Sequence, residues 1–72
     1  MAELEHILRI SRSAAAGNFN VLSTGEKLGA ALVLNRPDLL EQAGYTMAEA
    51  IDRVGPDWLV LIPEAARTLT DE

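Results

Sequence analysis

The titratable side chains that could support catalysis are one imidazole and two close pairs of carboxylates. The chain has a single histidine, His6, and no cysteine. The pairs are Asp38 with Glu41, and Glu49 with Asp52. General acid–base or nucleophilic catalysis needs a base beside a nucleophile, or two carboxylates in unlike environments, usually inside a pocket. Both pairs have the spacing of solvated helix faces, so we predict a protein that is not an enzyme and has no catalytic residues.

Metal binding is the second chemistry that the sequence could support. Glu3 and His6 lie three residues apart, as do ligands in carboxylate-bridged helical bundles, but such sites need further glutamates and a second pair of this kind. A homodimer could duplicate this half-site. Charged residues near a chain start are more often ordinary surface, and without cysteine there is neither a thiolate metal site nor a disulfide. We therefore predict no metal and no cofactor.

A helix-turn-helix is the third possibility. Residues 37–54 have the length of two short helices joined by a turn at Gly44, which is the layout of this DNA-reading motif. The helix that would enter the groove offers Glu49 and Asp52 with only Arg53, whereas contacts with phosphate and guanine need several basic or amide side chains. A helix-turn-helix transcriptional regulator is thus an alternative function.

The charge distribution argues against nucleic acid and membranes as partners. The 72 residues carry eleven acids and six bases, a net charge of −5. Acids and bases cancel in residues 1–20, whereas the remainder has nine acids against four bases. Such a surface repels phosphates and anionic lipids. No basic leader is present and no apolar run reaches the roughly 20 residues of a membrane span, so we expect a cytoplasmic protein. An acidic inhibitor of a basic, nucleic-acid-binding partner is a further alternative.

Protein recognition remains, and Trp58 is its best candidate residue. Tryptophan is enriched at binding hot spots, and Trp58 heads the apolar run 58–62. It could equally fill the core against Leu28, Leu32 and Ile51. If Trp58, Leu59 and Leu61 cannot all turn inward, those that stay outside would form an exposed apolar patch, which a second copy of the chain would cover. The candidate partner-binding residues are Trp58, Leu59, Leu61, Glu49 and Asp52. We predict a non-catalytic acidic module that binds a protein partner or regulates it, with a homodimer as one form.

The first part of the chain predicts an amphipathic helix followed by a connection. Residues 2–16 place Leu4, Ile7 and Leu8 on one helical stripe, and Gly17 would end this helix. Residues 18–22 alternate polar and apolar types, which favours an extended segment with Phe19 and Val21 on the same side. In a single domain, we expect residues 1–17 to be an N-terminal helix with freedom to move and residues 18–72 to be a compact helical core.

Two helix starts carry the capping-box pattern, in which a hydroxyl residue precedes a glutamate by three positions. They are Ser23 with Glu26, and Thr46 with Glu49. The first box opens a helix over 24–34 that is apolar on every side, as expected for the central element. Gly25 and Gly29 in this helix suggest the close approach of another backbone.

The remaining residues predict three more helical segments. Pro37 begins a short helix that ends before Gly44. The helix after Thr46 should bury Met47, Ala50, Ile51 and Val54 and expose Glu49, Asp52 and Arg53. Pro63 should keep Ile62 out of a regular helix, so residues 58–62 favour a kinked helix over a buried strand. The sequence thus predicts an all-α fold, a small orthogonal bundle of four to five short helices. The expected core residues are Leu28, Leu32, Leu40, Ile51, Val54, Trp58 and Leu61.

Overall fold

The computed structural model describes residues 2–71, and all regular structure in this range is helical. The helices are α1 (Ala2–Ser13), α2 (Thr24–Val33), α3 (Pro37–Ala43), α4 (Met47–Val54), α5 (Pro56–Leu59) and α6 (Ile62–Thr70). A π-helical turn, η1 (Ala14–Asn18), and a 3-10 turn, η2 (Phe19–Val21), join α1 to α2. This confirms the all-α bundle of short helices.

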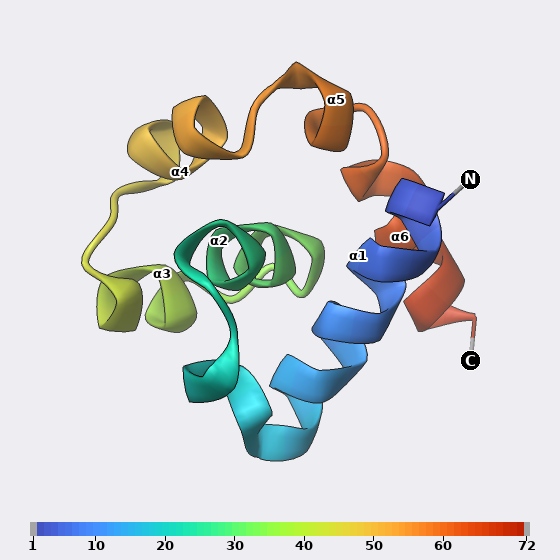
Figure 1. Ribbon diagram of the computed structural model, residues 1–72, viewed down its shortest axis with the longest axis horizontal. Coiled ribbons are helices and arrows are strands. Elements are labelled where there is room, and N and C mark those ends of the chain that lie inside the picture. Colours follow the sequence, from blue (N-terminus) through green and yellow to red (C-terminus); the bar gives the residue numbers. More distant parts are fainter. Residues whose placement is uncertain (1, 72) are drawn as a thin grey trace.

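Helix α2 lies at the centre of the bundle. Figure 1 looks along α2, with α1, α3 and α4 arranged around it, and α2 packs against α1, α3, α4 and α6. Leu28, Ala30 and Ala31 are almost completely buried. The predicted capping box is present, because Ser23 Oγ accepts from the Glu26 N–H at 3.4 Å and Glu26 Oε1 accepts from the Ser23 N–H at 3.0 Å. The prediction of α2 as the enclosed central helix is confirmed.

The buried side chains form two clusters that meet on α2. The larger cluster consists of Ile10, Ala14, Phe19, Leu28, Ala30, Ala31, Leu39, Leu40 and Ala50. The smaller one joins α1, α2 and α6 through Ile7, Val33 and Ala65. Trp58 packs against both clusters, so it connects the two halves of the core.

The predicted core is largely correct, with α4 as the exception. Two of the predicted residues are buried and four are partly buried against the clusters: Leu28 and Leu40, then Leu32, Val54, Trp58 and Leu61. The burial predicted for Ile51 and Met47 is wrong, because these residues are 42% and 51% exposed. Helix α4 packs on α2 at the buried Ala50. A helix with one main neighbour buries only the side chains that face it.

The connection after α1 differs from the extended segment that the alternating pattern predicted. Gly17 has a left-handed φ of 99° and kinks η1, at the position where the sequence predicted that the first helix would end, and the chain then forms the 3-10 turn η2. Phe19 is 5% exposed, and the Lys27 Nζ lies 5.7 Å from its ring centroid, whereas Val21 is 80% exposed. Residues two apart in a 3-10 turn point to different sides, which is why the two side chains separate.

Helices α3 and α4 form a hairpin with the predicted ends. Pro37 opens α3 and Gly44 ends it with a φ of 85°. The second capping box is present at the start of α4, where the Thr46 N–H donates to Glu49 Oε1 at 2.9 Å and the Glu49 N–H donates to Thr46 Oγ1 at 3.1 Å. The local capping signals therefore predicted these helix ends correctly.

The last part of the chain consists of two helices with a turn between them, and not of a strand. Gly55 has φ 88° and ψ 163°, a combination that is essentially restricted to glycine, and it turns the chain from α4 into α5. The prediction of a kinked helix over a strand for residues 58–62 is confirmed, because these residues form the end of α5, a turn and the start of α6. The expectation that Ile62 would be non-helical is wrong, because Pro63 lies in the first turn of α6, where a missing N–H costs no helical hydrogen bond.

Candidate functional site

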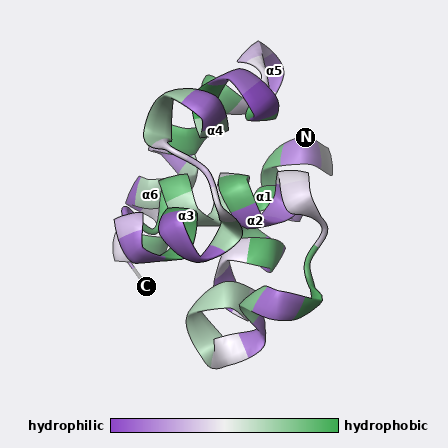
Figure 2. Cartoon of the chain, turned by 90° about the vertical axis from the view of Figure 1, so that its left-hand side faces the viewer, coloured by the Kyte–Doolittle hydropathy of each residue, from purple (hydrophilic) through white to green (hydrophobic). Residues whose placement is uncertain are grey.

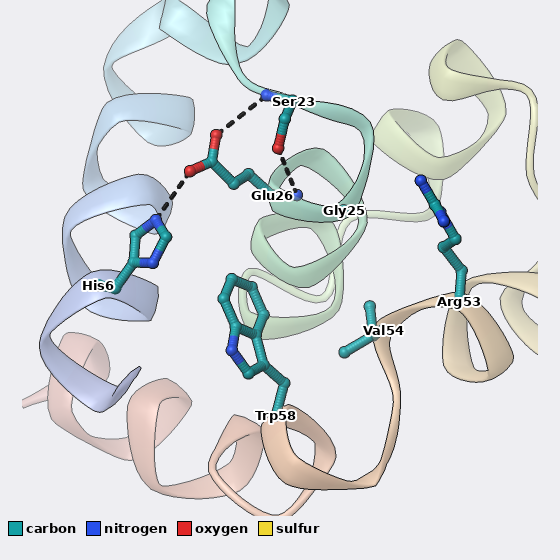
Figure 3. A pocket seen from close by; sticks show the side chains of 7 residues that line it. All are labelled: His6, Ser23, Gly25, Glu26, Arg53, Val54 and Trp58. Carbon is teal, nitrogen blue, oxygen red and sulfur yellow. Dashed lines mark hydrogen bonds and ion pairs between the residues drawn. The ribbon is translucent and has the colours of Figure 1, made fainter. Parts of the chain in front are cut away.

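A cavity of about 310 Å³ opens between α1, the start of α2, the end of α4 and α5. Figure 3 shows the side chains that line it: His6, Ser23, Gly25, Glu26, Arg53, Val54 and Trp58. The Trp58 indole stands between the His6 side and the Val54 side of this cavity (Figure 3). Its volume is at the lower end of the range of ligand pockets in proteins. We call it the Trp58 cavity.

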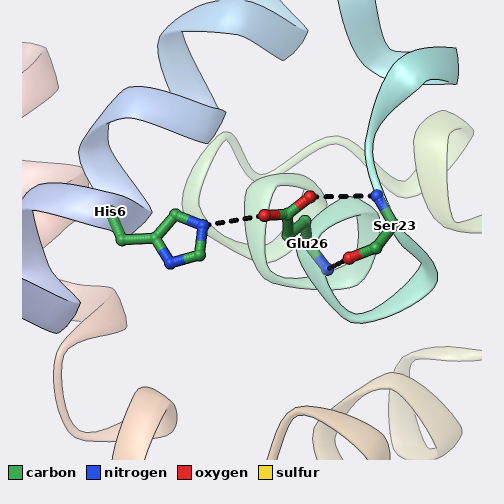
Figure 4. A network of polar contacts seen from close by, with 3 residues as sticks. All are labelled: His6, Ser23 and Glu26. Carbon is green, nitrogen blue, oxygen red and sulfur yellow. Dashed lines mark hydrogen bonds and ion pairs between the residues drawn. The ribbon is translucent and has the colours of Figure 1, made fainter.

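One wall of the Trp58 cavity is a hydrogen-bonded network between α1 and α2 (Figure 4). The His6 Nε2 lies 2.7 Å from Glu26 Oε2, and the Ser23 N–H donates to Glu26 Oε1 at 3.0 Å. Because an ionised carboxylate can only accept, the proton of the first bond belongs to His6 Nε2. The Ser23 backbone N–H, and then His6, hold the pKa of Glu26 below its ordinary value. Both carboxylate oxygens are thus already engaged.

This network resembles a catalytic triad in residue types but not in geometry. A triad needs the serine hydroxyl against the imidazole, whereas Ser23 Oγ accepts from the Glu26 N–H as the helix cap. The contact of His6 with Glu26 ties α1 to α2. Sequence reasoning missed this contact, because the two residues lie 20 positions apart and no local spacing joins them.

Trp58 lies against the backbone of α2 at Gly29. A Cβ at Gly29 would lie 2.7 Å from Trp58 Cζ3 and 2.9 Å from Cε3, so the indole occupies the space of the missing side chain. The His6 ring meets the indole edge to face, with centroids 5.5 Å apart and an interplanar angle of 84°. The predicted close approach at Gly29 is therefore made by a side chain. At Gly25 the prediction is wrong, because nothing lies within 4 Å of an added Cβ.

The other candidate partner-binding residues lie in two different settings. Leu59 and Leu61 are partly buried, and Leu61 packs on the smaller cluster; the exposed apolar residue of this run is Val60, at 74%. Glu49 and Asp52 are exposed on α4. Glu49 also has a structural role as the second half of the α4 capping box.

Helix α4 carries an exposed apolar surface that contains Met47 and Ile51, which the sequence pattern assigned to the core. Met47 and Ile51 lie four positions apart and Ala48 lies three positions before Ile51, so these exposed residues adjoin one another on one side of the helix. We call this surface the α4 strip. Asp52 lies one helical turn after Ala48, at the edge of the strip. Figure 2 shows hydrophobic and hydrophilic residues along α4.

Arg53 differs from the other arginine of this region. Arg36 forms two hydrogen bonds with the Asp38 carboxylate, at 2.9 and 2.7 Å, which lower the pKa of Asp38. Arg53 lines the Trp58 cavity on the side away from His6 (Figure 3). Within residues 2–71, it has no ion pair with a carboxylate.

Two other kinds of site are missing from the described part of the chain. Among these residues, no group of three or more histidine, cysteine, aspartate or glutamate side chains could hold a metal ion. None of the helices in the described range has the length and apolar character needed to cross a bilayer.

No family model matches the chain, and neither a curated protein nor a solved structure matches it.

Proposed function

We propose that this protein is a non-catalytic module that binds a protein partner through the α4 strip. The observation that carries the proposal is the exposure of Met47 and Ile51 on a helix whose apolar stripe predicts their burial. A small domain gains stability from every apolar side chain that it covers. Two large side chains left outside, beside each other, fit a surface that a partner covers.

The charge around the strip favours a basic partner. Residues 36–60 contain five carboxylates and two arginines, a net charge of −3, and Asp52 borders the strip. An amphipathic helix with two apolar residues at helical spacing, flanked by lysine or arginine, would complement both features. A second copy of the chain is less favoured because it would bring two surfaces of the same negative sign together.

A helix-turn-helix DNA-binding protein is the main competitor. The α3–α4 hairpin has the layout of such a motif, but the charged side chains that α4 exposes are Glu49 and Asp52 with only one cation, Arg53. One arginine beside two carboxylates is a weak basis for contacts with phosphate, which need several basic side chains. The composition of α4 therefore supports protein recognition over DNA recognition.

The proposal is tested by a titration followed in ¹H–¹⁵N NMR spectra. The probe is a helical peptide with two leucines four positions apart and flanking lysines; its control has the same leucines and flanking glutamates. We expect the basic peptide to shift the amide signals of α4 and the acidic peptide to bind at least tenfold more weakly. Ile51→Ser should abolish the shifts, whereas the matched exposed change Val21→Ser, in η2, should leave them unchanged.

Three results would contradict the proposal. One is an absence of shifts on α4 at millimolar concentrations of the basic peptide. Another is firm retention on heparin at low salt, which would favour DNA. The third is a dimeric mass by light scattering that Ile51→Ser converts to a monomer, which would assign the strip to self-association.

A further inference from the structure

We infer that the Trp58 cavity binds a small organic anion that has a flat apolar body and a carboxylate, and that Arg53 receives this carboxylate. This site is separate from the α4 strip and does not depend on the function proposed above. It combines an aromatic wall, an open volume and a cation that has no ion-pair partner within residues 2–71.

The charges that line the cavity favour an anion, although the whole chain is acidic. The only carboxylate among the lining residues is Glu26, and its two oxygens accept from the Ser23 N–H and from His6 Nε2. Arg53 has no ion-pair partner in the described range. A guanidinium binds a carboxylate through two parallel hydrogen bonds, so Arg53 gives the cavity a charge that a ligand carboxylate would match.

The shape of the cavity favours a flat apolar body. Trp58 and Val54 supply apolar surface, and Gly25 leaves open space at the start of α2, with nothing within 4 Å of an added Cβ. Figure 3 places the Trp58 indole between His6 and Arg53. An aromatic ring could thus pack beside the indole while its carboxylate reaches Arg53. The volume of about 310 Å³ suits a ligand with a single ring.

This ligand chemistry has two sources, a free aromatic acid and the C-terminal carboxylate of a peptide that ends in an aromatic residue. The test uses both. The first probe is 3-phenylpropionate with 3-phenylpropionamide as its uncharged control. The second is a short peptide that ends in phenylalanine, with a free or an amidated C-terminus. Binding is followed through the indole N–H signal of Trp58 in ¹H–¹⁵N NMR spectra.

We expect at least one carboxylate probe to shift the Trp58 signal with a Kd of about 1 mM or below, as small ligands of this size allow. The matching amide should bind at least tenfold more weakly. Arg53→Gln should weaken binding about tenfold and Arg53→Lys less. Arg67→Gln, which makes the same charge change at an exposed position of α6, should have no effect. A comparison of the two probes identifies the source.

Two further variants distinguish binding inside the Trp58 cavity from binding elsewhere on the surface. Gly25→Leu should fill the cavity and abolish binding while the spectrum stays that of a folded protein. Ile51→Ser, on the α4 strip, should leave the affinity unchanged. Equal binding of carboxylates and amides, equal losses for the Arg53 and Arg67 variants, or no shift of Trp58 with either probe at 10 mM (about ten times the expected Kd) would overturn the inference.

Discussion

The contact between Gly29 and Trp58 yields a sharp prediction, which concerns Gly29→Ala. A methyl group at Gly29 would lie 2.7 Å from Trp58 Cζ3 and 2.9 Å from Cε3. These are atoms of a rigid ring that is itself in contact with the His6 ring and with both core clusters. The indole can therefore relieve the overlap only by moving as a whole.

Two opposing effects set the magnitude. Alanine stabilises a helix over glycine by about 1 kcal/mol, and overpacking a core contact costs about 1–3 kcal/mol. We expect the free energy of unfolding of Gly29→Ala to fall by about 1 kcal/mol, with a melting temperature about 4–8 °C lower. Gly25→Ala is the matched control on the same helix, because nothing lies within 4 Å of its added Cβ. It should stabilise the protein by about 0.5–1 kcal/mol.

The assay is urea unfolding followed by the fluorescence of Trp58, the only tryptophan. The emission of Gly29→Ala should also shift to longer wavelength as the indole moves outward. In a double-mutant cycle, with unfolding followed by circular dichroism because Trp58→Phe removes the tryptophan signal, Trp58→Phe should remove most of the penalty, since the smaller ring leaves room for the methyl group. If Gly29→Ala stabilises the protein as much as Gly25→Ala does, the packing of Trp58 on α2 is refuted.

Three other predictions test the fold. Ser11 is fully buried and its Oγ has no hydrogen-bond partner among the described residues, so Ser11→Ala should raise the free energy of unfolding by about 1 kcal/mol in urea titrations; a lower value would show that the hydroxyl is satisfied. The pKa of Glu26 is lower in the folded than in the unfolded chain. The stabilisation that its ionised carboxylate gives to the fold is therefore present above about pH 4.5 and is lost as the pH falls through the pKa of Glu26 in the folded chain. Thermal melts from pH 6 to 2.5 should show this loss in the wild type and less of it in Glu26→Gln. Gly55→Ala should cost on the order of 1–3 kcal/mol because of its φ of 88° and ψ of 163°, and an unchanged melting temperature would contradict that strain.

Local sequence signals predicted the helix ends well, because each end depends on neighbouring residues. The capping boxes at Ser23 and Thr46 and the glycine after α3 each satisfy backbone groups within one turn. The alternating pattern of residues 18–22 failed because periodicity over five residues cannot separate a 3-10 turn from an extended segment. The burial predicted from the apolar stripe of α4 was partly wrong, because a sequence pattern shows which side chains can be buried but not how many neighbours the helix has.

The candidate site was less accessible to sequence reasoning than the fold. Trp58 was identified from its residue type and its place at the head of an apolar run. The contact of His6 with Glu26 and the position of Arg53 beside the Trp58 cavity follow from the packing of α1 and α4 around α2. These are tertiary relations between residues far apart in the chain, so no local spacing could reveal them.

The most direct test of the proposed function is photo-crosslinking from the α4 strip. One variant carries a photoreactive amino acid at position 47, and a control variant carries it at the exposed position 64 on α6. Each is activated by light in the cells that make the protein, and the adducts are analysed by mass spectrometry. We predict an adduct at position 47 to a different protein through a lysine- or arginine-rich segment, which Ile51→Ser removes, and no such adduct at position 64. Crosslinks to nucleic acid, crosslinks only to a second copy of the chain, or equal adducts from both positions would contradict it.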